Sequence, residues 1–427
     1  MLITKVDSWE ALDSRGRPTV ATRVALEGGA LGVALVPSGA SAGSHEALEL
    51  RDGGGRYGGR GVRKAVGHVT DTLAPLVTGL TPTRVDAALR AADRSPSFAV
   101  VGANAVLSVS LAAQLAAAAA HGTSLARYLA ADTGPLLLPM PMVNILSGGA
   151  HAGRMLDVQD FLVVPVGATS FAQAVEWAVA VREAATRLAL ARGHAQAVLV
   201  ADEGGLGLPL ATNRAALDLL TEAIRAAGFA PGTEVAIAID VAATQFFHEG
   251  RYRLAREQRE LTATGLIAEI ARWCDHYPVI SVEDALAEDD WEGWQEATAV
   301  LGERVELVGD DLFVTSAERL RRGITEGVAN SVLVKVNQNG LVGSSRAVVD
   351  LARTAGYRTV VSARSGETED SWLADLAVGW RAGQIKVGST HRSERTAKWN
   401  RLLELEATED TVFAGPWPGG RPGKDAA

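Results

Sequence analysis

SVLVKVN (residues 331–337) is a short apolar run, rich in β-branched residues, that closes on a lysine and an asparagine. Four other segments share this form: EVAIAID (234–240), PVISVED (278–284), VELVGDD (305–311) and GQIKVGS (383–389). Their charged residues lie 43, 27, 25 and 51 residues apart and are Asp240, Glu283, Asp310, Lys335 and Lys386. One strand, one helix and two turns take roughly 25–45 residues, so this spacing predicts a β/α barrel.

The strands of such a barrel point their C-terminal ends into one shared cavity. We therefore expect the carboxylates of Asp240, Glu283 and Asp310 to converge there with the amino groups of Lys335 and Lys386. Three acids can hold a hard divalent cation through oxygen atoms. A lysine beside that cation has its pKa lowered and can act as a base. The pattern predicts a metal-dependent enzyme that removes a proton.

The composition excludes several other classes of protein. The 427 residues are 47% hydrophobic and 21% charged, which is enough for a large core and for a module beyond the barrel. A net charge of −9 argues against nucleic-acid binding but allows a small anionic substrate. The single cysteine, Cys274, is expected in the core, and one thiol suits a reducing cytoplasm.

Two segments bear on targeting and membranes. The N-terminal segment MLITKVDSWE has no apolar run after a basic start, so we expect no secretory signal. ANAVLSVSLAAQLAAAAAHG (103–122) is long and apolar, but it is mostly alanine interleaved with polar residues. We expect a buried helix here rather than a membrane span.

The organisation of the chain changes near LLLPMPMVN (136–144). Residues 1–60 alternate like a β meander, and 61–135 have the apolar spacing of helices, which predicts a small α+β N-terminal domain over 1–135. Strand-like and helical segments then alternate through 136–414, the predicted barrel. The Pro/Gly-rich end, 415–427, is expected to be loose.

Two further motifs fit the ends of barrel strands. DEGG (202–205) follows AVLVA, which places Glu203 at the cavity if that run is a strand; the alternative is a solvated turn. SARSGETEDS (362–371) follows YRTVV, and Arg364 with Ser365 can bind phosphate through a guanidinium and a hydroxyl. The alternative is an ordinary polar loop.

Two loops give weaker signals. PSGASAGSHEALELRDG (37–53) is small and flexible enough to close over a ligand, although a surface turn has the same composition. GGAHAGRMLDVQDF (148–161) carries His151 and Asp160, and spacing alone favours a surface histidine.

Together these strings resemble the enolase family, in order and over nearly the whole chain. The matching strings are LDSRGRPTV, VPSGASAGSHEALELRDG, PMPMVNILSGGAHAG, DEGG, IDVAATQFF, VEDALAEDDW, VGDDLFVT, VLVKVNQNG, RSGETED and QIKVGSTHRSERTAKWN. The resemblance implies a small α+β domain followed by a modified β/α barrel of the enolase type. It also implies two Mg²⁺ ions per active site, a small anionic phospho-carboxylate substrate, and a homodimer or larger assembly.

The resemblance also implies a role for each matching residue. Asp240, Glu283 and Asp310 would bind the tightly held Mg²⁺, and Ser41 in the closing loop would contact the second. Lys335 would take the proton next to the substrate carboxylate, and Glu203 would help the β-hydroxyl leave. The remaining residues would hold the substrate or line the mobile loop: Lys386 at the carboxylate, Arg364 and Ser365 at the phosphate, and His151 and Gln159 in the loop.

Several positions depart from the family pattern. Ala363 stands where the family has histidine, which removes a donor beside the phosphate. Asp160 stands where the family has glutamate, which withdraws a carboxylate by about 1.5 Å, one carbon–carbon bond. Ala42, Ser147, Ala285 and Asn339 also differ.

These departures allow three interpretations. Space beside the phosphate favours a substituted phosphorus group, as in the carboxyphosphonoenolpyruvate synthases of phosphinate antibiotic biosynthesis, which the chain would then resemble most. The second interpretation is an ordinary glycolytic enolase that acts on 2-phosphoglycerate. The third is a weakly active relative kept as a binding protein, which the intact acid and lysine set argues against.

Overall fold

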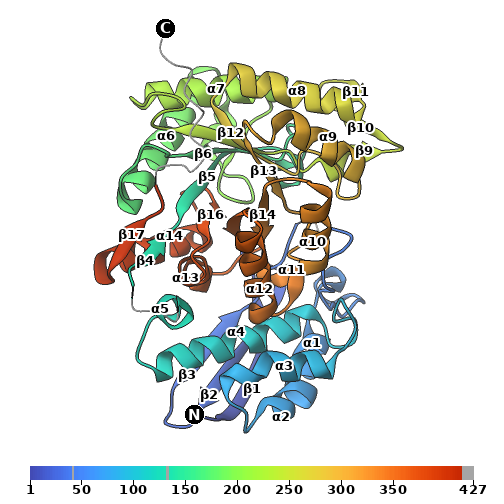
Figure 1. The fold of residues 1–427 in the computed structure, drawn as a ribbon, viewed down its shortest axis with the longest axis vertical. Helices are drawn as coiled ribbons and strands as arrows, with labels where there is room; N and C mark the ends of the chain where they lie inside the picture. Colours follow the sequence, from blue (N-terminus) through green and yellow to red (C-terminus); the bar gives the residue numbers. More distant parts are fainter. Residues whose placement is uncertain (41–42, 131–133, 416–427) are drawn as a thin grey trace.

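A computed structural model describes residues 1–40, 43–130 and 134–415. These residues form a small N-terminal domain, at the bottom of Figure 1, and a larger barrel domain above it. This is the predicted α+β domain followed by a modified β/α barrel. The boundary between residues 135 and 136 stays a prediction, and nearly all of the tail expected to be loose lies outside the described residues.

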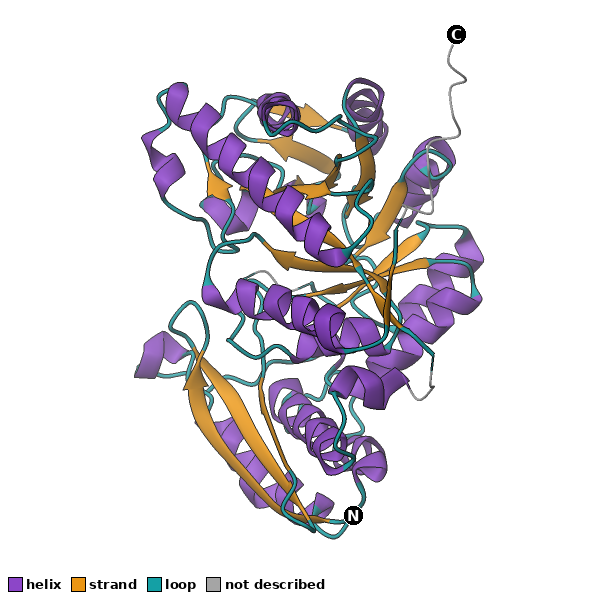
Figure 2. Cartoon of the chain, turned by 90° about the vertical axis from the view of Figure 1, so that its left-hand side faces the viewer, coloured by secondary structure: helices purple, strands orange, loops and turns teal. Residues whose placement is uncertain are grey.

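The N-terminal domain begins with an antiparallel sheet in the order β1-β2-β3. In its register Val6 lies opposite Val24, and Ala21 lies opposite both Trp9 and Leu35, so the predicted meander is confirmed as far as Leu35. The prediction extended it to residue 60, but the described residues after Leu35 contain no further strand of this sheet. Figure 2 shows this sheet with helices along one face. The elements of the domain are β1 (Ile3–Leu12), β2 (Pro18–Leu26), β3 (Leu31–Leu35), a 3₁₀ helix (Arg56–Gly59), α1 (Arg63–His68), a π turn (Val69–Leu73), α2 (Ala74–Val77), α3 (Pro82–Ala92), α4 (Ala103–Ala120) and α5 (Leu125–Ala130).

Helix α4 is the alanine-rich segment, and it is the central helix of this domain. It packs on β2 and β3 so closely that a Cβ at Gly32 would lie 2.1 Å from the carbonyl oxygen of Ala112. Small residues allow this approach. By length and composition the helix could cross a membrane, but 78% of it is buried inside the structure. The expected buried helix is confirmed.

Eight strands close the barrel, because β16 pairs with β5 as well as with β15. The strands are parallel except β6, which runs antiparallel to β5 and β8. Their residues are almost all buried, as expected for strands with packed side chains inside and helices outside. The barrel strands are β5 (Met140–Ser147), β6 (Asp160–Val164), β8 (Ala236–Asp240), β12 (Val279–Glu283), β13 (Glu306–Gly309), β14 (Ser331–Val334), β15 (Arg358–Ser362) and β16 (Gly383–Gly388).

Helices cover the outside of the barrel, and several begin at a side-chain cap. Ser170, Thr212, Thr262 and Ser316 each accept a hydrogen bond from the backbone N–H three residues on, a contact worth about 1 kcal/mol. The long helices are α6 (Phe171–Ala191), α7 (Asn213–Ala226), α8 (Ala263–His276), α9 (Trp291–Leu301), α10 (Ala317–Glu326), α12 (Val342–Thr354), α13 (Trp372–Gly379) and α14 (Ser393–Thr408).

Short elements complete the barrel domain. They are β4 (Leu136–Leu138), β7 (Leu206–Gly207), β9 (Phe247–His248), β10 (Arg251–Leu254), β11 (Arg259–Leu261), β17 (Thr411–Phe413), α11 (Val336–Asn339) and the 3₁₀ helices Gly149–Ala152, Ala195–Val198 and Ala243–Phe246. One predicted strand is wrong: AVLVA before the DEGG motif is a 3₁₀ helix followed by exposed residues. Its apolar side chains face solvent, so they do not form the buried face that a barrel strand needs. Cys274 is buried in α8, as predicted.

Candidate active site

The five charged residues named first lie at or near the C-terminal ends of five barrel strands. Asp240 and Glu283 are the last residues of β8 and β12, and Asp310 and Lys335 directly follow β13 and β14. Lys386 lies two residues before the end of β16. All except Glu283 line one polar cavity, and Glu283 reaches the group through Lys386. The predicted convergence is therefore present.

Lys386 sits between two of the acids. Its Nζ donates to Asp240 Oδ2 at 2.8 Å and to Glu283 Oε2 at 2.7 Å. Burial raises the pKa of Glu283, and the neighbouring Asp240 raises it further. Burial alone would lower the pKa of Lys386, but the Asp240 and Glu283 carboxylates outweigh it and raise that pKa. The second oxygen of Glu283, Oε1, is buried with no hydrogen-bond partner among the described residues.

Lys335 contacts Asp310 in the same way. Its Nζ donates to Asp310 Oδ2, and Gln338 Nε2 donates to the other oxygen at 2.9 Å. Burial lowers the pKa of Lys335, but Asp310 outweighs it, so the pKa is raised. The pKa of Lys335 is therefore raised and not lowered as expected, because the charge of Asp310 outweighs burial and the nearby Arg364.

A second group of acids lies next to the first and was missed from the sequence. Ligand oxygens of Asp284, Asp310 and Asp311 lie within 4.8 Å of one another. The Asp284 carboxylate accepts the backbone N–H groups of Asp310 and Asp311, both at 2.9 Å. Burial is the main cause that raises the pKa of Asp311, and the charge of Asp310 is the second; together they raise it to about 7. The only sequence signal was that each acid directly follows a predicted ligand, in the pairs ED and DD.

These donors fit a hard divalent cation such as Mg²⁺. They are carboxylate oxygens, the ligand type such ions prefer. Lys386 balances part of the charge of these acids, but Glu283 Oε1 stays buried without a hydrogen-bond partner among the described residues, which is unfavourable. Among the described residues, the acids whose oxygens lie close enough together to hold such an ion are Asp284, Asp310 and Asp311. The predicted ligand set of Asp240, Glu283 and Asp310 stays a prediction. Ser41, the residue expected to contact a second ion, and Ala42 lie outside the described residues.

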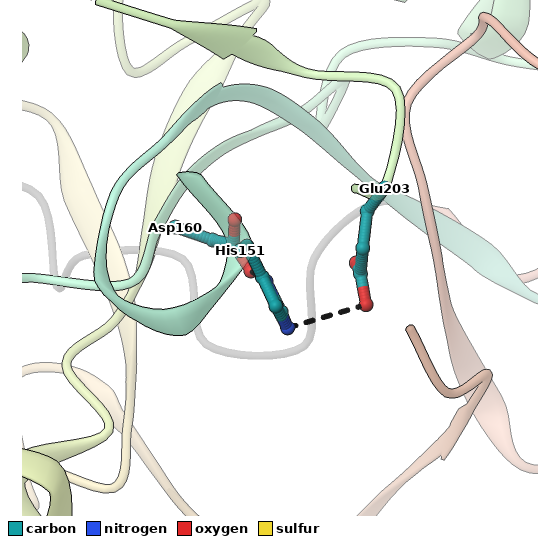
Figure 3. A group of neighbouring side chains, drawn as sticks. All are labelled: His151, Asp160 and Glu203. Atoms are coloured by element: carbon teal, nitrogen blue, oxygen red, sulfur yellow. Dashed lines mark hydrogen bonds and ion pairs between the residues drawn. The ribbon is translucent and has the colours of Figure 1, made fainter. Parts of the chain in front are cut away.

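His151, Asp160 and Glu203 form a buried chain of neighbouring side chains (Figure 3). His151 Nδ1 lies 2.7 Å from Asp160 Oδ2, and its Nε2 lies 3.6 Å from Glu203 Oε1. Burial lowers the pKa of His151, but the two carboxylates raise it to about 9. The interpretation of His151 as a surface residue, which spacing alone favoured, is wrong: its side chain is only 8% exposed.

The protonation of this chain differs from the sequence expectation. The role that the family resemblance implies for Glu203, helping the β-hydroxyl leave, would need a protonated carboxyl group, which a raised pKa favours. Burial does raise the pKa of Glu203, but the charges of His151, Arg395 and Lys386 outweigh burial, and this pKa is lowered. Burial raises the pKa of Asp160 instead. Protonated His151 therefore lies between the two carboxyl groups.

The position of Glu203 depends on close backbone packing rather than on a strand end. Gly204 has φ +85°, and a Cβ there would lie 2.5 Å from the carbonyl oxygen of His391. The Glu203 carbonyl also accepts the N–H of Ser389, at 2.8 Å. The glycine pair of the DEGG motif thus allows the backbone at Glu203 to pack closely against the loop that follows β16.

Arg364 and Ser365 line the cavity beyond the end of β15. Arg364 donates to Glu46 at 2.9 and 3.1 Å and to Asn337 Oδ1 at 2.9 Å. Ser365 Oγ accepts from Arg15 of the N-terminal domain at 3.3 Å. Both domains therefore build this end of the site. The roles of Glu46 and Arg15 were missed, because their partners are more than 300 residues away in the sequence.

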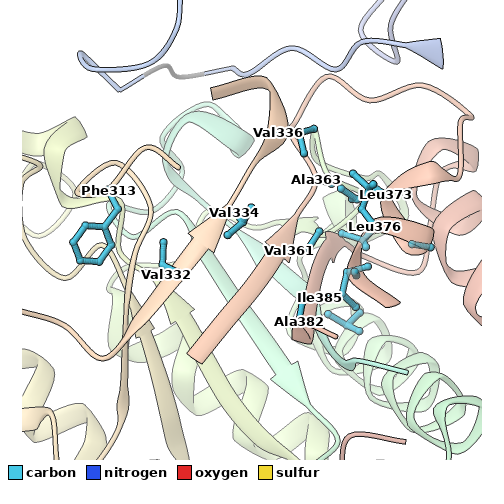
Figure 4. Packing of buried hydrophobic residues seen from close by; sticks show 14 of the residues in the cluster. Phe313, Val332, Val334, Val336, Val361, Ala363, Leu373, Leu376, Ala382 and Ile385 are labelled. Atoms are coloured by element: carbon cyan, nitrogen blue, oxygen red, sulfur yellow. The ribbon is translucent and has the colours of Figure 1, made fainter. Parts of the chain in front are cut away.

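Ala363 lies between the polar cavity and the apolar core. It lines the cavity and also belongs to the buried cluster that Figure 4 shows with Leu373 and Leu376 of α13. On the other side of the cavity, Gln159 donates to Asp240 Oδ2 at 3.1 Å. Every predicted site residue within the described part of the chain thus lies at the cavity or is paired with a residue that does.

Comparison with known proteins agrees with this geometry. A family model described as the enolase C-terminal TIM barrel domain matches residues 135–417, and one described as the enolase N-terminal domain matches residues 3–129. An enolase of Acidothermus cellulolyticus is 50% identical over 419 residues, which are 97% of this chain and 96% of that protein.

The chain belongs to the enolase family. Enolases are carbon–oxygen lyases of the hydro-lyase type that use Mg²⁺, and the acid clusters here can bind that metal. Their substrate is a small phosphorylated carboxylate. The similarity to an enolase over nearly the whole length favours ordinary enolase chemistry over the phosphinate interpretation. No comparison supports a role in antibiotic biosynthesis.

Proposed function

We propose that this protein is an ordinary enolase that removes water from 2-phosphoglycerate to give phosphoenolpyruvate. The observation that carries the proposal is one cavity that is lined by Lys335, Lys386, Asp240 and Asp310 together with Arg364 and Ser365. The 50% identity to an enolase supports it. The cavity offers cationic and hydroxyl groups for a phosphate and a carboxylate at once.

The reaction requires a proton to leave a carbon next to a carboxylate. Lys335 is the proposed base, and it must be neutral when it accepts that proton. Lys386, released from Asp240 and Glu283, would hold the substrate carboxylate. Bound at Asp240, Glu283 and Asp310, Mg²⁺ would stabilise the negative charge that builds on the carboxylate. A second Mg²⁺ at Ser41 remains part of the proposal.

The second step releases the β-hydroxyl as water, which requires a proton. Glu203 is the proposed donor, but its lowered pKa makes it a carboxylate in the unliganded chain. His151, with a pKa raised to about 9, lies 3.6 Å away and can supply that proton. Asp160 holds the other ring nitrogen, and Gln159 lies beside Asp240. We therefore infer that His151 and Glu203 act as a pair.

A substituted phosphorus group is the second candidate, and Ala363 favours it. Ala363 has a methyl group where the family motif has the imidazole of a histidine. It lines the same cavity as Arg364 and Ser365. A larger substituent than oxygen on phosphorus could use that volume. The altered Asp160 lies at the leaving-group end and does not bear on this choice.

A paired assay distinguishes the two candidates. Purified protein with Mg²⁺ is given 2-phosphoglycerate or its carboxyphosphono analogue, and enolpyruvate formation is followed for each. Turnover of 2-phosphoglycerate with kcat/KM of about 10⁴ M⁻¹s⁻¹ or more, within the usual range of enzymes, supports the first candidate. Turnover of the analogue alone would replace it with the second.

We also propose a reducing cytoplasmic setting and a homo-oligomer. The single buried thiol, Cys274, supports the first. The second rests on family resemblance, and sedimentation velocity of the purified protein tests it.

A further inference from the structure

Arg395 is a fully buried arginine on α14 whose guanidinium contacts the backbone of the loop after β15 and of strand β16. Nη1 donates to the carbonyl oxygens of Arg364, at 2.7 Å, and Val387, at 2.9 Å. Nη2 donates to the carbonyl oxygen of Ser365. Its charge is balanced in part by Glu394, 3.6 Å from Nε.

The three carbonyl groups belong to two elements of the proposed substrate site, which follow or lie in the neighbouring strands β15 and β16. Arg364 and Ser365 are the proposed phosphate ligands, and Val387 directly follows Lys386, the proposed carboxylate ligand. A single planar guanidinium therefore links the two binding elements. Arginine presents donors in a rigid fork, so it fixes the separation of its acceptors in a way that a flexible ammonium cannot.

A second buried contact from the same helix holds the same loop. Lys398 Nζ pairs with Glu367 Oε2 at 3.0 Å and donates to the Thr368 carbonyl at 2.6 Å. The other oxygen of Glu367 accepts the backbone N–H of Arg364 at 2.9 Å. Helix α14 thus holds the phosphate-binding loop through two side chains, Arg395 and Lys398, which lie about one helical turn apart.

Burying two cations against backbone carbonyls is costly unless the geometry is satisfied. Apolar side chains would hold α14 against the barrel without that cost. Arg395 also packs at the base of Glu203, because a Cβ at Gly388 would lie 3.0 Å from Arg395 Cδ and 2.8 Å from the Glu203 carbonyl oxygen. Arg395 therefore contacts residues of the proposed site, in addition to packing α14 against the barrel.

We propose that Arg395 is a positioning residue that sets the spacing between the phosphate-binding loop at Arg364–Ser365 and the carboxylate-binding Lys386. This inference rests on the proposed function, because it uses the two substrate-binding ends assigned there. It does not make Arg395 a substrate ligand.

The test compares Arg395→Lys with Arg401→Lys on the same helix. Arg401 is also a largely buried arginine, but it pairs with Asp375 at 2.9 and 2.8 Å, away from the site. Each variant is assayed for KM and kcat on 2-phosphoglycerate with Mg²⁺. The dissociation constants of inorganic phosphate and of Mg²⁺ alone are measured by calorimetry, and folding is checked by circular dichroism.

Arg395→Lys is expected to raise KM and the phosphate dissociation constant at least about tenfold, since a 1 Å misplacement costs on the order of 100-fold in rate. The Mg²⁺ constant stays within about threefold, because the acids lie on other strands. Arg401→Lys leaves KM within about twofold. Wild-type values for Arg395→Lys, or equal losses in both variants, would overturn the inference.

Glu367→Gln serves if Arg395→Lys fails to fold. It keeps an acceptor for the Arg364 N–H but removes the charge paired with Lys398, so the phosphate constant is expected to rise about fivefold, roughly the value of one hydrogen bond; an unchanged constant rejects the positioning by α14. If wild-type protein does not dehydrate 2-phosphoglycerate, the proposed function fails. The phosphate constants still decide the role of Arg395.

Discussion

Lys386 Nζ lies 2.8 Å from Asp240 Oδ2 and 2.7 Å from Glu283 Oε2, so one ammonium group neutralises two predicted metal ligands. The lysine thus acts as a counter-ion for these acids. A cation bound at the acids would release it toward the substrate carboxylate.

Lys386→Met is expected to destabilise the metal-free protein. Removing one partner of a buried ion pair costs about 3–5 kcal/mol of unfolding free energy, and here two carboxylates lose their partner. Added Mg²⁺ restores much of the loss, because it binds the folded state only. Denaturant unfolding with a chelator and with Mg²⁺ measures both effects.

Lys5→Met is the matched control, since Lys5 pairs with Asp7 on the surface and exposed pairs contribute about 0–1 kcal/mol. Equal unfolding free energies for Lys386→Met and wild type in chelator would contradict the arrangement described here.

His151 predicts a specific dependence of stability on pH. Its pKa rises from 6.5 to about 9 in the folded chain. The stabilisation by its charged form is therefore complete below pH 6.5 and is lost as pH rises to about 9, a change of at most about 3 kcal/mol. The His151→Asn variant lacks this pH-dependent stabilisation, because asparagine does not titrate. Unfolding free energies in chelator should differ between the two proteins at pH 6 and converge above pH 9, whereas a constant difference would show that His151 does not titrate there.

Ala363→His restores the donor that the family motif places beside the phosphate. We expect kcat/KM for 2-phosphoglycerate to rise about fivefold, the value of roughly one hydrogen bond. Ala363→Ser is the control for a small polar group at the same position. An unchanged kcat/KM in a correctly folded histidine variant would mean that position 363 does not select the substrate.

Gly388→Ala tests how tightly Glu203 is held. The new Cβ would lie 2.8 Å from the Glu203 carbonyl oxygen, at φ +114°. We expect a fall in kcat of at least about tenfold, because misplacing a reacting group by 1 Å can cost on the order of 100-fold. Gly383→Ala, on the same strand at φ +84° with no atom within 4 Å, carries backbone strain without the clash. Equal kcat values for the two variants would refute the steric account.

Much of the fold was predictable because burial and strand ends leave local signals. Apolar β-branched runs that stop at a charged residue identified β8, β12, β13, β14 and β16, and alanine spacing identified α4. The run AVLVA has the same composition as a strand, yet it lies on the surface. Local composition does not reveal which face a segment turns to the core.

The residues of the candidate site could be predicted from the sequence, but their protonation states could not. The pKa of Glu203 depends on His151, Arg395 and Lys386, which lie far away in the sequence. Arg395 stood in a quoted motif with no role, because its contacts span 30 residues to Ser365 and 31 to Arg364. Contacts between residues far apart in the sequence determine the pKa of Glu203 and the role of Arg395, so no local sequence pattern predicts them.

In the proposed mechanism, Lys335 removes a proton from carbon before Glu203 and His151 help the hydroxyl leave. Incubation of 2-phosphoglycerate with Mg²⁺ in D₂O, followed by NMR, measures deuterium exchange at the carbon next to the carboxylate and phosphoenolpyruvate formation in the same sample. Wild type should show both, Glu203→Gln exchange with little product, and Lys335→Met neither. Product formation or exchange at the wild-type rate in Lys335→Met would contradict the account.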